Sequence, residues 1–250
     1  MNSISQSFVT AFSLIVSLDA ALWSIVARSL WVSGLACLLA SGAGVLMGAW
    51  LAVARFGGRR VVLMALNTLL AIPSVVVGLL VYLLLSRSGP LGFLGWLFSV
   101  KAMVLAQALL VWPIVAALTR QLVEDADKLH GEQLLSMGAG SWQRAMLHVW
   151  DERFAVLTVL LAAFGRAIAE VGAVMVVGGN MEGFTRVMTT AIALETSKGD
   201  LPLALGLGLV LMGVVLLLNA GVAGVRSLVA ARDYRALPKE LESFAVKGGL

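Results

Sequence analysis

The chain has 250 residues, of which 60% are hydrophobic and only 13% are charged, and its mean hydropathy is +0.97. Charged residues alone make up about a quarter of an ordinary soluble protein, so this composition excludes a water-soluble globular fold and indicates a protein that lies in a lipid bilayer. The single cysteine, Cys37, lies in an apolar run and is predicted to be a small packing residue.

The N-terminal residues 1–28 are predicted to form an extracytoplasmic segment at the membrane interface. The first residues lack the basic stretch of a cleaved signal peptide, so we expect the N-terminus to be mature. Residues 8–27 are apolar but include Asp19. An interfacial helix is favoured there, and a sixth transmembrane helix is the alternative.

The region 29–226 contains apolar runs that match the thickness of a membrane. A helix needs about 20 apolar residues to cross a hydrocarbon core of about 30 Å. Pro73 and Pro113 each remove a backbone donor and should kink the helices that contain them, while Gly44 and Gly48 are spaced for close helix approach. The fold class is therefore an all-α membrane protein, a polytopic helical bundle with transmembrane helices expected at 29–54, 61–86, 102–119, 154–177 and 201–225.

Lysine and arginine gather in alternate loops of this bundle, at 55–60, at 120–153 and after residue 225. Short loops rich in these residues stay in the cytoplasm. The N-terminus is therefore expected outside and the C-terminus inside, with 227–250 as a cytoplasmic tail. The same loops account for the net charge of +4, so nucleic acid is not expected as a partner.

The segment 121–153 is the sizeable polar region inside the chain. Helix-forming residues at 125–137 predict one short helix, the break at 138–140 predicts a turn, and Ser141 is placed to cap a second short helix. The pattern predicts two helices folded across the cytoplasmic membrane face. Such a segment either docks a partner or serves as a solvated connector between spans.

Glu132 and Gly138 give this loop its resemblance to a known family. They fall at the spacing of the Glu-Ala-Ala and Gly motif in membrane subunits of binding-protein-dependent ABC importers, although Gln133 and Leu134 replace the two alanines and no proline ends the motif. In that family the loop is a coupling helix that sits in a groove of the ATPase. The resemblance implies that the ATPase-coupling residues here are Glu132, Gln133, Leu134, Ser136, Gly138 and Ala139.

Further blocks resemble the permeases of bacterial tungstate importers. They are NTLLAIPSVVVGLLVYLLLS at 67–86, SGPLG at 88–92, FGRAIAEVGA at 164–173, GGN at 178–180 and TTAIALE at 189–195. The resemblance implies the core fold of molybdate and methionine importer permeases, a homodimer in the bacterial inner membrane, a cytoplasmic ATPase subunit and an extracytoplasmic oxyanion-binding protein. Tungstate is the favoured cargo, and molybdate or a sulfate-like oxyanion is the alternative. ATP and Mg²⁺ are expected on the ATPase, with no cofactor in this chain.

Arg166 and Glu170 are charged residues inside the fourth predicted span. A spacing of four places them on one helix face, and an unpaired charge near the bilayer centre costs at least about 3 kcal/mol, so we expect them to pair. The pair either fixes the helix among its neighbours or lends positive potential to an oxyanion pathway. Asn180, Thr189 and Thr190 are further pathway candidates, on or beside a short outer helix expected at 183–195.

Two other classes of function fit the sequence less well. An ATPase would need a phosphate-binding loop and an intramembrane enzyme would need clustered catalytic or metal-binding groups, whereas the two histidines, His130 and His148, both fall in the cytoplasmic loop. We therefore expect no enzyme. A stand-alone secondary transporter commonly shows repeated halves, which this sequence lacks.

Overall fold

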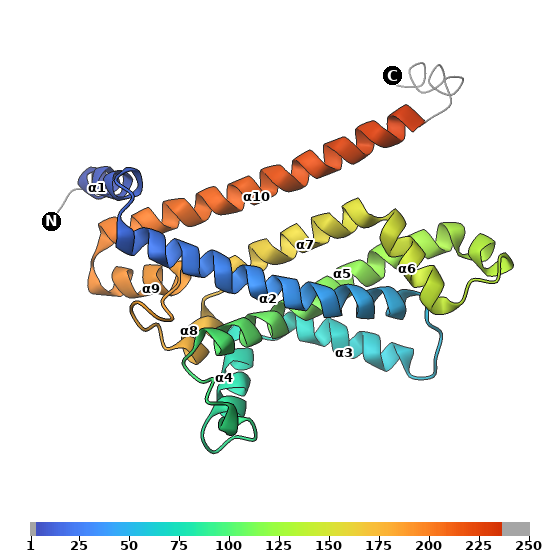
Figure 1. Ribbon diagram of the computed structural model, residues 1–250, viewed down its shortest axis with the longest axis horizontal. Helices are drawn as coiled ribbons and strands as arrows, with labels where there is room; N and C mark the ends of the chain where they lie inside the picture. The colour runs from blue at the N-terminus through green and yellow to red at the C-terminus, as the bar shows by residue number, and fades with distance from the viewer. Residues whose placement is uncertain (1–3, 237–250) are drawn as a thin grey trace.

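The computed structural model describes residues 4–236, which form α-helices and one short 3-10 helix without a β-strand (Figure 1). The helical fold class predicted from composition is confirmed. The elements are α1 (Ile4–Val16), α2 (Ala20–Val53), α3 (Arg59–Ala71), α4 (Ser74–Leu85), η1 (Gly92–Leu94), α5 (Val100–Ser136), α6 (Ser141–Asp151), α7 (Arg153–Ile168), α8 (Gly172–Gly178), α9 (Met188–Lys198) and α10 (Leu201–Ala236).

Helices α2 and α5 form the central and most extensive helix pair. A Cβ atom added at Gly48 would lie 2.3 Å from the Ala116 carbonyl oxygen, and one at Gly44 would lie 2.8 Å from Val115 Cβ. These contacts confirm the close approach predicted for the two glycines. Cys37 is buried in the cluster that joins α2, α5 and α7, as its predicted packing role requires.

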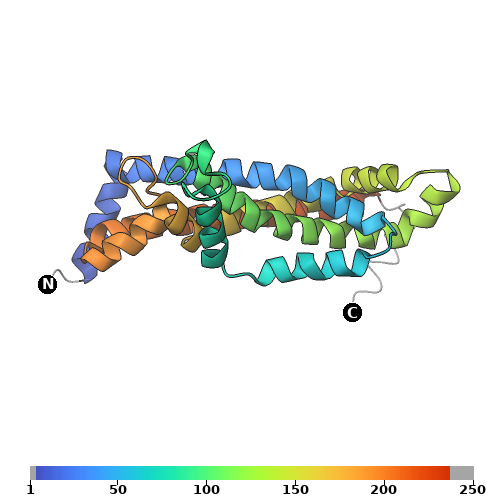
Figure 2. The same cartoon turned by 90° about the horizontal axis from the view of Figure 1, so that it is seen from below.

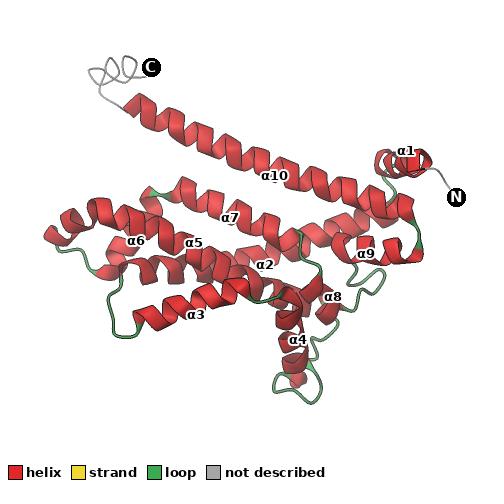
Figure 3. Cartoon of the chain, turned by 180° about the vertical axis from the view of Figure 1, so that it is seen from behind, coloured by secondary structure: helices red, strands yellow, loops and turns green. Residues whose placement is uncertain are grey.

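The remaining long helices form layers on the two sides of this pair. Figure 2 shows α5 between α2 and α3. On the other side α7 contacts both central helices, and α10 lies outside α7 (Figure 3). Within residues 4–236, three helices are individually long and apolar enough to cross a membrane, and up to five spans result if each bent helix pair counts as one, in agreement with the predicted number.

The second and fourth spans are broken rather than continuous. Helices α3 and α4 meet at an angle of 101°, and α7 and α8 at 57°. The expectation of one kinked helix at 61–86 was wrong because Ile72, the residue before Pro73, is extended, which ends the helix there. By contrast, α5 continues through Pro113 as a single helix of 37 residues.

The two broken spans pack on each other beside their breaks. A Cβ added at Gly78 of α4 would lie 2.7 Å from Ala173 Cα of α8. A Cβ added at Gly172 would lie 2.7 Å from Val75 Cγ2. Gly78 lets the α4 backbone approach the α8 backbone, and Gly172 leaves room for the Val75 side chain, so the junction of the breaks is tightly packed.

The N-terminal segment is two helices and not one. Helix α1 has 13 residues, too few to cross a core of about 30 Å, and it lies across the end of the bundle (Figure 1). Asp19 then caps α2 by accepting a hydrogen bond from Leu22 N–H at 2.9 Å. Residues 8–27 therefore do not form a sixth span, and the predicted boundary at residue 28 falls inside α2.

The last helix extends further than the sequence predicted. Helix α10 runs to Ala236, so residues 227–236 of the predicted tail are helical, and residues 237–250 lie outside the described residues. The end of α10 lies at the same end of the bundle as the turn between α5 and α6, while α1 and α9 lie at the opposite end (Figure 1).

Candidate coupling hairpin and membrane-embedded polar residues

The polar loop forms a helical hairpin at one end of the bundle. Its first half is not a separate helix, because α5 runs without a break to Ser136, and extending an existing helix is easier than nucleating a new one. Gly138 follows in the left-handed conformation with φ +81°. Helix α6 is capped one residue earlier than predicted, since Gly140 N–H donates to Gln143 Oε1 at 2.9 Å and Ser141 is already helical.

Asp127 clamps the two arms of this hairpin together. Arg144 Nη2 donates to Asp127 Oδ2 at 2.6 Å and to Oδ1 at 2.8 Å, and His148 Nε2 lies 3.1 Å from Oδ1. The side chains of Arg144 and His148 are 9% and 2% exposed. Burial would raise the pKa of the Asp127 carboxyl, but the hydrogen bonds with Arg144 and His148 outweigh it and hold this pKa below its ordinary 3.8.

The backbone around the clamp is shaped to accommodate it. A Cβ at Gly131 would lie 2.7 Å from Asp127 Oδ1, so a glycine one turn along α5 leaves room for the carboxylate. Closer to the membrane, Glu124 pairs with Arg120 and lies 3.6 Å from Arg59 Nη2 at the start of α3. Ionic contacts therefore connect α3, α5 and α6 at this end of the bundle.

The predicted coupling residues do not all lie on one surface. Leu134, Gly138 and Ala139 line a groove of about 630 Å³ together with residues that sequence reasoning missed, namely Met137, Gln143, Met146 and Leu147. Glu132 instead lines a polar pocket of about 330 Å³ beside α2 and α3. Ser136 Oγ donates to the Gln133 carbonyl at 2.7 Å. The heptad-like placement of Gln143, Met146 and Leu147 on α6 was the signal that could have found them.

The predicted pair of Arg166 and Glu170 is present, with Arg166 Nη1 2.8 Å from Glu170 Oε2. The two residues are not on one helix, because α7 ends at Ile168 and Glu170 lies in the break before α8. Glu170 also accepts a hydrogen bond from Ala173 N–H at 3.2 Å. The Glu170 side chain is 4% exposed and that of Arg166 is 49% exposed, so the guanidinium is half open to its surroundings.

Thr189 joins this group, whereas Asn180 and Thr190 form a second one. Thr189 Oγ1 donates to the Glu170 carbonyl at 2.7 Å. Asn180 Nδ2 donates to the Thr190 carbonyl at 3.2 Å, and Thr190 Oγ1 accepts from Val187 N–H at 3.1 Å. Both threonines are buried and bond to the backbone, and α9 begins at Met188 rather than at 183. A pathway role for these residues stays a prediction.

Comparison with known proteins supplies the family of this helical chain. No family model matches it. It is 39% identical over 220 residues to the tungstate uptake system permease protein TupB of Peptoclostridium acidaminophilum, covering 88% of this chain and 96% of the relative. The chain belongs to the family of tungstate uptake permeases. TupB of Campylobacter jejuni is 36% identical, covering 88% and 92%, and the molybdenum permease ModB of Escherichia coli is 33% identical, covering 71% and 82%.

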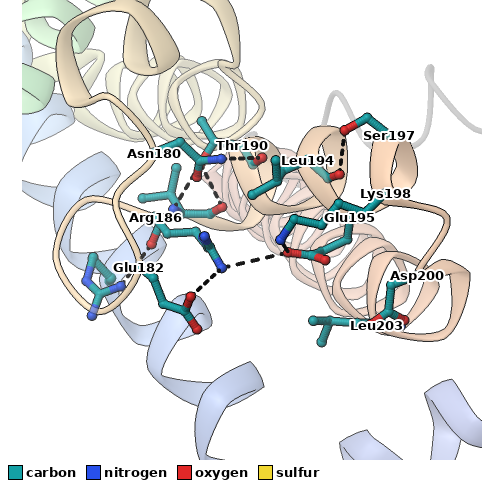
Figure 4. A network of polar contacts seen from close by, with 12 residues as sticks. Asn180, Glu182, Arg186, Thr190, Leu194, Glu195, Ser197, Lys198, Asp200 and Leu203 are labelled. Atoms are coloured by element: carbon teal, nitrogen blue, oxygen red, sulfur yellow. Dashed lines mark hydrogen bonds and ion pairs between the residues drawn. The ribbon is translucent and has the colours of Figure 1, made fainter.

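The permease carries another polar network at the end opposite the hairpin, which the sequence did not reveal (Figure 4). Arg186 Nη1 lies 3.6 Å from Glu182 Oε2 and 3.7 Å from Glu195 Oε1, and Lys198 Nζ lies 3.1 Å from the same Glu195 oxygen. Arg28 of α2 donates to the Arg186 and Gly183 carbonyls at 3.0 and 2.8 Å. These contacts hold α9 and the loop before it against α2.

Proposed function

We propose that this chain forms the pathway for tungstate in an ABC importer, as the permease subunit in a bacterial inner membrane. The observation that carries the proposal is the similarity over almost the full length to two permeases named for tungstate uptake. Their names describe permease subunits, so ATP hydrolysis is assigned to a partner chain that holds ATP and Mg²⁺. This chain then needs no cofactor of its own.

The hairpin of α5 and α6 is the proposed docking surface for that ATPase. It projects from one end of the bundle and presents exposed apolar side chains, including Met137 at 75% exposure and Trp142 at 51%. Apolar side chains outside the bilayer in such a cluster are typical of an interaction site. The internal clamp at Asp127 makes the hairpin stiff enough to transmit a movement of the ATPase to α5, which continues into the membrane.

A paired substitution tests this docking surface. Met137→Glu places a charge in the groove, and because burying an unpaired charge is costly, the ATPase recovered with the permease should fall at least tenfold. Leu129→Glu is the matched control, since Leu129 is 79% exposed on α5, the helix that Met137 follows, but lies outside the groove. If both variants lost the ATPase equally, or if neither lost it, the groove would not be its docking surface.

The orientation follows from the distribution of basic residues. We propose that the hairpin and the end of α10 are cytoplasmic and that α1 and α9 are extracytoplasmic, because lysine and arginine concentrate in the first group of loops. An oxyanion-binding protein would then deliver its cargo at the end that holds α9. A second copy of the permease would complete the pathway as a homodimer.

Arg166 is the proposed source of positive potential for the oxyanion inside the membrane. Its half-exposed guanidinium requires water, an anion or a polar partner, because exposure to hydrocarbon is unfavourable. Glu170 balances the charge and limits how tightly an anion is held. Arg166→Leu should abolish uptake while the dimer and its ATPase still assemble, and Arg166→Lys should retain part of the uptake. Loss of assembly in Arg166→Leu would support a purely structural pair.

Metal accumulation in cells tests the cargo. Cells without tungstate and molybdate importers, supplied with this permease, its ATPase and its binding protein, should accumulate tungsten in preference to molybdenum from equal external concentrations. Mass spectrometry of the cell metal content provides the measurement. The similarity to ModB makes molybdate the second candidate, and preferential accumulation of molybdenum would favour it.

A further inference from the structure

An apolar groove runs between α2 and α5, away from the coupling hairpin and from the pair of Arg166 and Glu170. Its volume is about 570 Å³. The lining residues are aliphatic or aromatic apart from one lysine, Lys101, and include Leu35, Leu39, Ala43, Val104, Ala108 and Trp112. Small alanine side chains lie among the larger leucine, valine and tryptophan side chains of the lining.

The length of the groove matches one leaflet of a bilayer. Lys101 and Trp112 both belong to α5 and are separated by about 16 Å along the helix, at 1.5 Å per residue. Half of a hydrocarbon core of about 30 Å is about 15 Å. With Lys101 at the membrane–water interface, where the predicted span begins, the groove would end near the bilayer midplane. One acyl chain of a lipid spans a single leaflet, so its length matches that of the groove.

The interfacial end of the groove carries a positive charge without a carboxylate partner. In the described part of the chain the one contact of the Lys101 ammonium is with the Trp96 ring, whose centre is 5.5 Å away. Lysine and tryptophan at this depth are the residue types that anchor proteins at lipid headgroups. Lys101 is exposed, so its charge is free to meet a phosphate.

We propose that this groove binds a single anionic phospholipid, with one acyl chain between α2 and α5 and the headgroup phosphate on Lys101. The charge of Lys101 selects an anionic headgroup, and the apolar walls select the chain. The bound lipid would complete the packing of the central helix pair, which has no other cover at this place among residues 4–236.

Native mass spectrometry of the full-length permease tests the proposal. The protein is stripped of lipid in detergent and titrated with phosphatidylglycerol or with phosphatidylcholine of the same acyl chains. We expect one tightly held phosphatidylglycerol, bound about fivefold or more in preference to phosphatidylcholine, since one basic residue near the surface supplies that much selectivity. Lys101→Gln should reduce the preference to about one. Ala43→Leu should fill the groove and release both lipids.

Two control variants separate this site from general surface effects. Arg87→Gln removes another exposed positive charge from the same predicted side of the membrane, and Gly42→Leu introduces a leucine side chain beside the groove, where nothing lies within 4 Å. Both controls should bind lipid like the unmodified permease. Unchanged selectivity in Lys101→Gln would overturn the headgroup assignment. Lipid retention by Ala43→Leu together with dissociation of permease dimers would show that a second copy occupies the groove instead.

Discussion

Removing the Asp127 carboxylate should open the coupling hairpin while leaving the membrane bundle intact. Asp127→Ala leaves Arg144 and His148 buried without their shared acceptor. Loss of one partner of a buried charged pair costs about 3–5 kcal/mol, and because Asp127 itself is 19% exposed, the lower value of about 3 kcal/mol applies. Each 1.4 kcal/mol is a factor of ten in an equilibrium, so local opening of α6 should become about a hundredfold more frequent.

Hydrogen–deuterium exchange of the backbone amides measures this opening directly. Peptides that cover residues 141–151 should exchange about a hundredfold faster in Asp127→Ala, while peptides from the contact of α2 with α5 stay unchanged. Asp125→Ala is the control, since Asp125 pairs with Lys128 at 2.8 Å on the exposed face of the same helix and such surface pairs contribute less than about 1 kcal/mol. Equal exchange in the two variants would refute the clamp.

Three further predictions concern glycines and pH. Gly138→Val forces a branched side chain into the left-handed region at a cost of about 1–2 kcal/mol, so ATPase stimulation by the loaded binding protein should fall, and unchanged stimulation would refute a strained turn. Gly48→Ala clashes with the Ala116 carbonyl and should destabilise the permease by about 1–3 kcal/mol, seen as a lower Tm, whereas Gly42→Ala, in open space, should not. Folding lowers the pKa of Asp127, so the stability that its carboxylate adds to the hairpin is complete above pH 3.8 and is lost as pH falls through the lowered pKa. The amides of α6 should therefore lose protection from exchange only in acid. Loss of protection between pH 5 and 7 would contradict the role of Asp127 as the clamp.

The spans were predictable because hydrocarbon imposes a simple rule on sequence. Uncharged runs between basic residues located the membrane helices, and Gly44 and Gly48 marked the tightest contact of the central pair. The ion pair of Arg166 and Glu170 was also predictable, because a spacing of four keeps the two side chains within reach even though α7 ends between them. These features depend on residues close together in the chain and on the lipid around them, so a single sequence is enough to predict them.

Other features depend on contacts between distant segments and could not be predicted. A proline such as Pro73 predicts a bend, but the angle of 101° follows from the packing of α4 on α8. The partners of Asp127 lie 17 and 21 positions away, beyond any helical periodicity. The glycines at 138 and 140 predicted the turn. The continuous helix through residues 120–136 was not predicted, because it forms as an extension of the membrane part of α5.

The most direct test of the proposed import function is uptake of labelled tungstate into vesicles that contain the permease, its ATPase and its binding protein. We expect uptake that requires ATP, that excess unlabelled tungstate blocks more strongly than molybdate or sulfate, and that Arg166→Leu abolishes in a fully assembled complex. Tungstate uptake that proceeds without ATP, or that is unchanged in Arg166→Leu, would contradict it.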